Sequence, residues 1–121
     1  MVAVYGTLRV GQPNNRLLRG CKHLGETITV VNATMYDNGY FPYVVLGEGD
    51  GPIVVDVYEV YDDTLYYLDY LEGYQGDSRY NHYERSLVEV MGFEEKALIY
   101  HVFKEDVEHL PVVESGNWFV K

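Results

Sequence analysis

The run Thr64-Leu-Tyr-Tyr-Leu-Asp-Tyr-Leu-Glu72-Gly73 predicts a helix. At about 100° per residue, its three leucines form one apolar stripe. Glu72 projects between Leu65 and Leu68 on that stripe, and Gly73 supplies the C-cap that ends the helix. We therefore expect an amphipathic helix that carries a carboxylate on its apolar face, in its last turn.

Two interpretations of Glu72 follow from this position. Glu72 can be an ordinary helix-terminal residue whose carboxylate extends to water. Alternatively, burial and the partial negative charge at the end of the helix both disfavour the ionised form, and both raise the pKa of Glu72. A carboxyl group whose pKa approaches neutrality is suited to general acid–base catalysis.

The composition favours a small cytoplasmic globular protein. Its 121 residues are enough for one hydrophobic core, so we expect a single domain over 1–121. No run of about 18 apolar residues predicts a membrane span, and the N-terminus lacks the features of a signal peptide. Cys21 is the only cysteine, which fits a reducing compartment. The net charge of −10 argues against a nucleic acid as partner.

Short runs rich in β-branched and aromatic residues predict strands between turns that contain glycine, Asn or Asp. Many short strands with one or two packed α-helices indicate an α+β fold, in which mixed strands curl into a small β-barrel. The predicted strands are Val2–Tyr5, Ile28–Tyr36, Phe41–Leu46, Ile53–Val60, Tyr83–Met91 and Lys96–Phe103.

Turn and cap residues define the remaining segments. A short helix is expected over 15–19, capped by Asn14, and Asp62 or Asp63 should cap the longer helix. The glycine-rich run 47–52 is expected to be a hairpin loop, and 73–82 a polar, mobile loop.

The first predicted strand leads directly into a glycine-containing loop, Tyr5-Gly-Thr-Leu-Arg-Val-Gly11. Its glycines have the spacing of a P-loop, but Gln12-Pro13 stands where Lys and Ser/Thr would have to follow, which excludes that phosphate site. The loop can be a plain turn. Alternatively, Gly6 allows a sharp turn in which the N–H groups from Gly6 to Leu8 point into one concavity. Opposite a carboxylate base, for which Glu72 is the candidate, that concavity would be an oxyanion site.

Two motifs carry a resemblance to a known family: Val4-Tyr-Gly-Thr-Leu8 with Gly11 and Asn14, and Leu68-Asp-Tyr-Leu-Glu72. Together they resemble the γ-glutamylcyclotransferase-like family, which includes γ-glutamylamine cyclotransferases and AIG2-like proteins. Weaker matches fall in the family's order along nearly the whole chain: Phe41-Pro42-Tyr43, Val57–Val60, Tyr83-Glu-Arg85 and Ser115–Trp118.

The resemblance implies an enzyme that converts a γ-glutamyl amine or γ-glutamyl peptide to 5-oxoproline and the free amine. Glu72 would be the general base and then the general acid. The backbone of the loop would bind the γ-glutamyl group, and two tyrosines at the cavity wall would hydrogen-bond the substrate, although packing is the other interpretation of both. The substrate-binding residues implied are Tyr5, Gly6, Thr7, Leu8, Tyr83 and Tyr100.

Three further expectations concern the surroundings of that site. Arg85 is expected to pair with a surface acid rather than with the substrate. Asp56 and Asn117 depart from the family's usual pattern, and we expect neither to contact the catalytic parts. The loops 47–52 and 73–82 are candidates for the wall that contacts the leaving amine.

Other chemistries fit the sequence poorly. The four histidines lack the spacing of a metal site, there is no second cysteine to help them, and no Gly-x-Ser-x-Gly motif is present, so we expect no metal and no cofactor. Two alternatives to catalysis stay open. One is a small-molecule binding or regulatory module that retains the cavity without turnover. The other is an acidic protein that inhibits a basic partner.

Overall fold

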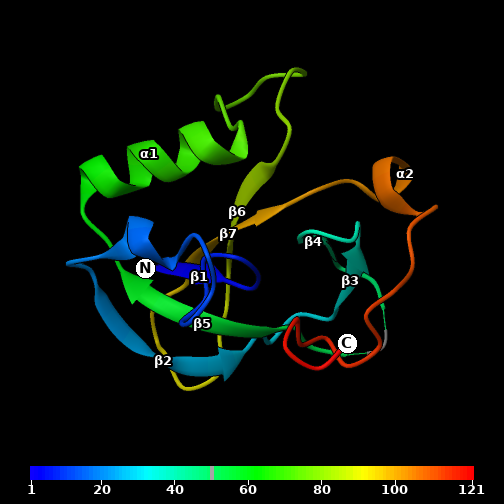
Figure 1. Ribbon diagram of the computed structural model, residues 1–121, viewed down its shortest axis with the longest axis horizontal. Helices are drawn as coiled ribbons and strands as arrows, with labels where there is room; N and C mark the ends of the chain where they lie inside the picture. Colours follow the sequence, from blue (N-terminus) through cyan, green and yellow to red (C-terminus); the bar gives the residue numbers. More distant parts are fainter. Residues whose placement is uncertain (50) are drawn as a thin grey trace.

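The computed structural model describes residues 1–49 and 51–121 and has an α+β fold, as expected (Figure 1). A five-stranded mixed sheet has the strand order β2-β5-β1-β7-β6, and β3 pairs with β4 in a separate two-stranded sheet. The strands are β1 Val2–Val4, β2 Lys22–Ile28, β3 Ala33–Asp37, β4 Pro42–Leu46, β5 Val54–Glu59, β6 Glu84–Val88 and β7 Ala97–His101. The helical elements are η1 Asn15–Leu18, α1 Asp62–Glu72 and α2 Lys104–Val107.

Strand β1 lies at the centre of the larger sheet, antiparallel to β5 and parallel to β7. Its residues are all buried, with Val2 and Val4 in one core cluster and Ala3 in the other. Leu68 of α1 packs in the first cluster and Met35 of β3 in the second. Because successive side chains of a strand point to opposite faces, the sheet is covered on both faces, and β1 is apolar throughout.

The strands curl around the core, as predicted, but hydrogen bonds do not close them into a barrel (Figure 1). Strands β3 and β4 bond only to each other as a sheet. Single bonds link them to the rest of the described chain, such as the one from the N–H of Val102 to the carbonyl of Val44, 2.9 Å. The cavity described below lies between the two sheets and α1.

The predicted strand over 28–36 is wrong in its bounds, because the chain turns between β2 and β3. Thr29 stabilises this turn: its hydroxyl donates to the carbonyl of Val31 and accepts from the N–H of Ile53. Strand β2 itself was not predicted. Its sequence, KHLGETI, is polar and it forms an edge of the sheet, where alternation of apolar residues is not required.

The run 47–52 is not a hairpin loop. Strand β4 pairs with β3, whereas β5 pairs with β1 and β2, so this segment connects the two sheets. Asp50 within it lies outside the described residues.

Helix α1 ends as predicted but starts differently. Gly73 is the C-cap in the left-handed conformation, and its N–H bonds to the carbonyls of Asp69 and Tyr70. Tyr61, not Asp62 or Asp63, occupies the N-cap, without a side-chain hydrogen bond. The two aspartates lie inside the first turn, where their negative charges interact favourably with the helix dipole.

The other helical elements are short. Residues 15–18 form a 3-10 helix, not an α-helix, and Asn14 gives no side-chain cap because its amide bonds elsewhere. Helix α2 is a single turn that the sequence did not predict. Across the described residues, no helix has the length and apolar character needed to cross a membrane.

Candidate active site

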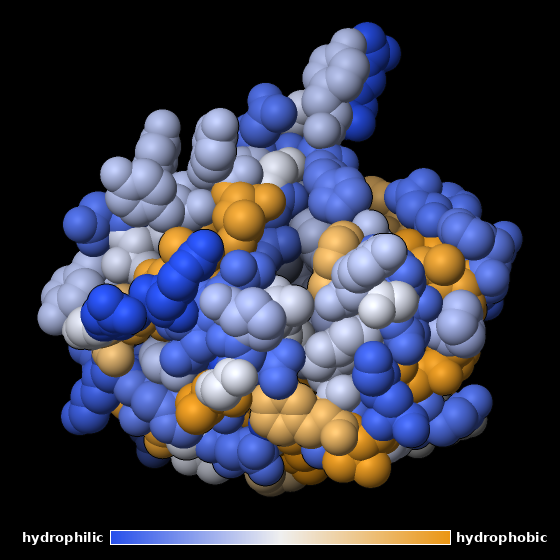
Figure 2. Space-filling model, in the orientation of Figure 1, coloured by the Kyte–Doolittle hydropathy of each residue, from blue (hydrophilic) through white to orange (hydrophobic). Residues whose placement is uncertain are grey.

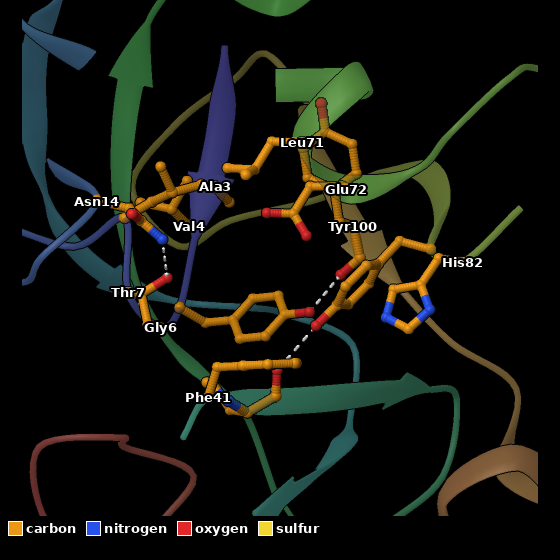
Figure 3. A pocket seen from close by; sticks show the side chains of 14 residues that line it. Ala3, Val4, Gly6, Thr7, Asn14, Phe41, Leu71, Glu72, His82 and Tyr100 are labelled. Carbon is orange, nitrogen blue, oxygen red and sulfur yellow. Dashed lines mark hydrogen bonds between the residues drawn. The ribbon is translucent and has the colours of Figure 1, made fainter. Parts of the chain in front are cut away.

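A cavity of about 180 Å³ lies where β1 ends, between the loop that follows it and the last turn of α1 (Figure 3). Pro42 at the start of β4, Tyr83 just before β6 and Tyr100 of β7 complete the wall. The structure brings all seven predicted site residues to this one cavity: Tyr5, Gly6, Thr7, Leu8, Glu72, Tyr83 and Tyr100.

The side chain of Glu72 points into the cavity, on the side opposite Gly6 and Thr7 (Figure 3). It is partly buried, and burial raises the pKa of Glu72 from 4.5 to about 7. Its neighbour on the helix stripe, Leu68, is fully buried, which contributes about 2 kcal/mol and holds the last turn against the sheet. Leu71 is about half exposed and lines the cavity. Because its pKa is about 7, the Glu72 carboxyl group can be either protonated or ionised at neutral pH.

The loop opposite Glu72 presents unused donors. Among the described residues, no protein acceptor binds the N–H groups of Gly6, Thr7 and Leu8. The carbonyls of Gly6 and Thr7, in contrast, accept from the N–H groups of Arg9 and Asn14, at 3.0 and 2.9 Å. Buried N–H groups are normally satisfied, so these three groups, whose residues line the cavity, are candidate donors to a ligand.

Position 6 requires glycine because the ring of Pro42 packs closely against it, not because of an unusual backbone angle. A Cβ added at this position would lie 2.6 Å from both Cγ and Cδ of Pro42. Its φ is not in the left-handed region, so the sharp turn expected from glycine's conformational freedom is not the reason for this residue. The absent side chain instead lets the loop pack directly against the start of β4.

Side chains of the following segment fix the loop. The amide nitrogen of Asn14 donates to the hydroxyl of Thr7 at 3.0 Å, and that of Asn15 donates to the carbonyl of Leu8 at 2.9 Å and to the hydroxyl of Tyr58 at 3.0 Å. Asn14 also lines the cavity. Its expected role as a helix cap is therefore replaced by a role in positioning the candidate oxyanion loop.

The three tyrosines in the cavity wall each donate to a protein acceptor. Tyr5 donates to the backbone carbonyl of Tyr100 at 2.7 Å, and Tyr83 to that of Pro42 at 3.2 Å. Tyr100 donates to the carboxylate of Asp69 at 2.7 Å. Burial is the main cause that raises the pKa of each phenol well above its ordinary value, so all three stay neutral. Their oxygens can still accept a hydrogen bond from a ligand.

Asp69 links this wall to an ion pair. Arg85 donates to the second carboxylate oxygen of Asp69 at 2.6 Å, and both side chains are 22% exposed. The expected pairing of Arg85 with an acid is confirmed, although the pair is partly buried. Tyr66, Tyr67 and Tyr70, on the other side of α1, are exposed.

A buried charge cluster that the sequence did not predict lies directly behind the loop. Arg9 is fully buried and donates to Asp56 at 3.0 Å, Asn117 at 2.9 Å and Glu26 at 2.7 Å. The ring of Phe119 covers its guanidinium at 3.9 Å. As expected, neither Asp56 nor Asn117 lines the cavity, but both bind Arg9, the residue that follows Leu8.

Several lining residues were missed as members of the site. Phe41 and Pro42 were noted only as part of a weak family match, and His82 only as the end of the loop 73–82 and as one of four histidines that do not fit a metal site. What could have identified them is their position beside turns that flank the predicted strands. The additional lining residues are Ala3, Val4, Asn14, Phe41, Pro42, Leu71 and His82.

Comparisons with known proteins show the family of this chain. The family described as "Gamma-glutamyl cyclotransferase, AIG2-like" matches residues 2–120. The gamma-glutamylcyclotransferase family protein ytfP of Citrobacter rodentium is 33% identical over 117 residues, which cover 97% of this chain and 93% of the relative.

Two solved structures have the same fold. The uncharacterized protein PH0828 of Pyrococcus horikoshii is 30% identical and superimposes with a TM-score of 0.75, covering 97% of this chain and 87% of that one. An AIG2-like protein from Mus musculus is 24% identical with a TM-score of 0.75, over 93% and 84% of the two chains. The latter identity supports the fold alone.

Proposed function

Because this chain belongs to the gamma-glutamyl cyclotransferase, AIG2-like family, we propose that it converts a γ-glutamyl amine or γ-glutamyl peptide to 5-oxoproline and the free amine. One observation supports the proposal most directly. Glu72, whose pKa is raised to about 7, lies across a small cavity from three backbone N–H groups that have no acceptor among the described residues. A proton acceptor and an oxyanion site on opposite walls suit the attack of an amine on an amide carbonyl.

The first step is attack within the substrate. The free α-amine of the γ-glutamyl group forms a bond to its own γ-carbonyl carbon, and Glu72 as carboxylate takes the proton that the amine loses. Because the reacting groups belong to one molecule, the protein needs mainly to hold the cyclic conformer. The small cavity, lined by Leu71 and Pro42 among others, suits that task.

The tetrahedral intermediate carries its negative charge on the former carbonyl oxygen. The N–H groups of Gly6, Thr7 and Leu8 bind that oxygen, and each donor of this kind contributes about 3–4 kcal/mol in other enzymes. These donors are fixed before the reaction by Asn14, Asn15 and Arg9, so little reorganisation is needed.

The second step returns the proton. Glu72, now protonated, donates it to the leaving nitrogen, the bond from that nitrogen to the γ-carbon breaks, and the carbonyl of 5-oxoproline forms. Glu72 is again a carboxylate. One group acts as base and then as acid, which is most efficient when its pKa lies near the working pH.

The tyrosines orient the γ-glutamyl group in this scheme. Since the phenol hydrogens of Tyr5, Tyr83 and Tyr100 are used within the protein, their oxygens can only accept from the substrate. The attacking α-amine has two hydrogens and gives one to Glu72, so one of these oxygens accepts the other. This refines the role that the family resemblance implies for Tyr83 and Tyr100.

The test is release of 5-oxoproline, measured by mass spectrometry, from γ-glutamyl-ε-lysine and a set of γ-glutamyl dipeptides. Glu72→Gln keeps the shape of the side chain but cannot transfer the proton, so we expect a loss of at least 1,000-fold in rate, of the order seen when an essential catalytic group is removed. Glu89→Gln, at an exposed position outside the cavity, is the matched control.

The outcome separates catalysis from its alternatives. Full activity in Glu72→Gln would exclude the mechanism. No turnover of any substrate, together with calorimetric binding of the same compounds, would instead identify a binding or regulatory module that retains the cavity.

A further inference from the structure

The C-terminal segment 113–120 lies beside the start of β5, and none of its residues, all of which are described, lines the cavity. The N–H of Val54 donates to the carbonyl of Gly116 at 2.8 Å, and Trp118 packs in a core cluster. Figure 1 shows the segment beside β5, and Figure 2 shows hydrophobic side chains at the lower edge of the same view. The segment is therefore anchored to the sheet, while the side chain of Phe119 stays half-exposed.

Arg9 is fully buried, although groups around it are exposed. Asp56 and Glu26 accept from its Nε and Nη2 at 3.0 and 2.7 Å, and the C-terminal segment supplies two further contacts. Oδ1 of Asn117 accepts from Nη1 at 2.9 Å, and the ring centroid of Phe119 lies 3.9 Å from the guanidinium carbon. Because Glu26 and Phe119 are exposed, the cluster lies just beneath the surface. Asn117 and Phe119 therefore help to separate the guanidinium from water.

Asp56 ties both ends of the candidate oxyanion loop to one residue of β5. Before the loop, Val4 of β1 lies opposite Asp56 in the register of the sheet. After it, Oδ2 of Asp56 accepts from Nε of Arg9 at 3.0 Å and from the N–H of Val10 at 3.2 Å. The N–H of Arg9 also donates to the carbonyl of Gly6 at 3.0 Å. The position of the Arg9 side chain therefore sets the direction in which the N–H groups of the loop point.

A closely bonded turn holds Asn117 in place for its contact with the guanidinium. Its N–H donates to the hydroxyl of Ser115 at 3.1 Å, and its carbonyl accepts from the N–H of Val120 at 2.9 Å. Its Oδ1 also accepts from the N–H of Phe119 at 3.1 Å. Gly116 in this turn has a φ of 65°, and a Cβ there would lie 2.5 Å from a backbone carbonyl oxygen of the segment before β5. The turn thus presents Asn117 as a fixed acceptor.

We propose that Asn117 and Phe119 are positioning residues for the proposed reaction, and that they act through Arg9 on the candidate oxyanion loop. The inference rests on the proposed function, because it concerns how that loop is held. With its cover removed, the guanidinium meets water, and its attraction to Asp56 weakens as that of an exposed ion pair does. The loop N–H groups then lose the fixed direction that stabilises the tetrahedral intermediate, whereas binding of the substrate in its ground state changes little.

Kinetics of variants at the two positions test this role, with the γ-glutamyl compound that the wild type converts fastest. In Phe119→Ala and Asn117→Ala, kcat should fall about tenfold and KM should stay within about twofold, because only stabilisation of the transition state is lost. Phe119→Trp, which keeps a ring over the guanidinium, should retain at least about half of the wild-type kcat.

Two variants of the same segment are the controls. Val120→Ala truncates an exposed side chain in the same turn and should leave kcat and KM unchanged. Val113→Ala removes buried atoms from the core cluster, so it should lower the thermal stability but, assayed well below its unfolding temperature, keep kcat within about twofold. The comparison separates positioning of the loop from a general loss of stability.

A measurement on the loop itself needs no turnover. Nitrogen-15 relaxation of the amides of Gly6, Thr7 and Leu8 reports how tightly these groups are held. A rigid backbone has an order parameter of about 0.85, and a flexible one has a value below about 0.6. We expect rigid values in the wild type and in Val120→Ala, and a fall of at least about 0.1 in Asn117→Ala and Phe119→Ala.

The possible results distinguish this inference from the proposed function. Turnover in which Phe119→Ala and Asn117→Ala keep the kcat of Val120→Ala, or lose activity through KM instead, would overturn the inference and leave the cyclotransferase standing. A loss of kcat in Val113→Ala as large as in Phe119→Ala would do the same. If the wild type converts no γ-glutamyl compound, the proposed function fails. Unchanged order parameters in Asn117→Ala and Phe119→Ala would then overturn the inference by themselves.

Discussion

Tyr100 donates its phenolic hydrogen to the carboxylate of Asp69 across 2.7 Å and so joins β7 to α1 beside the cavity. Asp69 lies one helical turn before Glu72, and its other oxygen accepts from Arg85. The bond between Tyr100 and Asp69 therefore fixes both Tyr100 in the cavity wall and the end of α1, which carries the candidate catalytic carboxylate of Glu72.

Asp69→Ala should consequently lower kcat/KM for γ-glutamyl substrates about tenfold. Tyr100 loses its acceptor and Arg85 its partner, at a cost of about 1–2 kcal/mol in stability because the ion pair of Arg85 and Asp69 is partly exposed. Steady-state kinetics and thermal unfolding measure the two effects. Asp62→Ala, at the exposed start of the same helix, is the control. Wild-type kcat/KM in Asp69→Ala would show that the position of Tyr100 does not depend on this bond.

The position of Glu72 should make the protein less stable as the pH rises. Its pKa is raised from 4.5 to about 7, so the folded state binds this proton more tightly than the unfolded state does. Both states are protonated below pH 4.5, and the folded state loses stability between pH 4.5 and 7, by up to about 3 kcal/mol.

Glu72→Gln removes that titration. Chemical denaturation at several pH values should show equal stability of variant and wild type near pH 4, and a variant that is more stable at pH 8. Equal stability at both pH values would mean that the carboxylate is not desolvated in the folded protein. Such a gain in stability with a loss of activity is common where a catalytic group is held in an unfavourable environment.

The sequence predicted those parts of the site that depend on local patterns. The stripe of leucines placed Glu72 on a buried helix face, and the glycine-containing loop after β1 indicated backbone donors. Both are features of consecutive residues, so neither requires knowledge of the tertiary structure.

The parts that were missed depend on residues far apart in the chain. Arg9 meets Glu26, Asp56 and Asn117 only in the folded protein, and nothing in its neighbours indicates a buried charge. The role of Pro42 against Gly6 is likewise a tertiary contact. Strand β2 was missed for a different reason, because an edge strand can be polar and still pair through its backbone.

Gly6→Ala should disrupt the candidate oxyanion loop. The new Cβ would lie 2.6 Å from two atoms of the Pro42 ring, which cannot rotate away, so the loop must shift. We expect a loss of about 1–3 kcal/mol in stability and a loss of at least tenfold in kcat. Gly51→Ala is the control, because a Cβ there meets no atom within 4 Å and φ is not in the left-handed region. Activity in Gly6→Ala equal to that of Gly51→Ala would contradict a role for the loop's exact position.

Asp56→Ala should be the most damaging of these substitutions to stability. Asp56 is 2% exposed and accepts from the guanidinium of Arg9, which is fully buried, at 3.0 Å, and from the N–H of Val10 at 3.2 Å. Breaking a buried ion pair by removing one partner costs about 3–5 kcal/mol, because the remaining charge stays buried. Glu59→Ala, an exposed acid on the same strand, should cost less than about 0.5 kcal/mol. Urea denaturation of both variants measures the difference. A cost below about 1 kcal/mol for Asp56→Ala would mean that Glu26 and Asn117 alone satisfy Arg9.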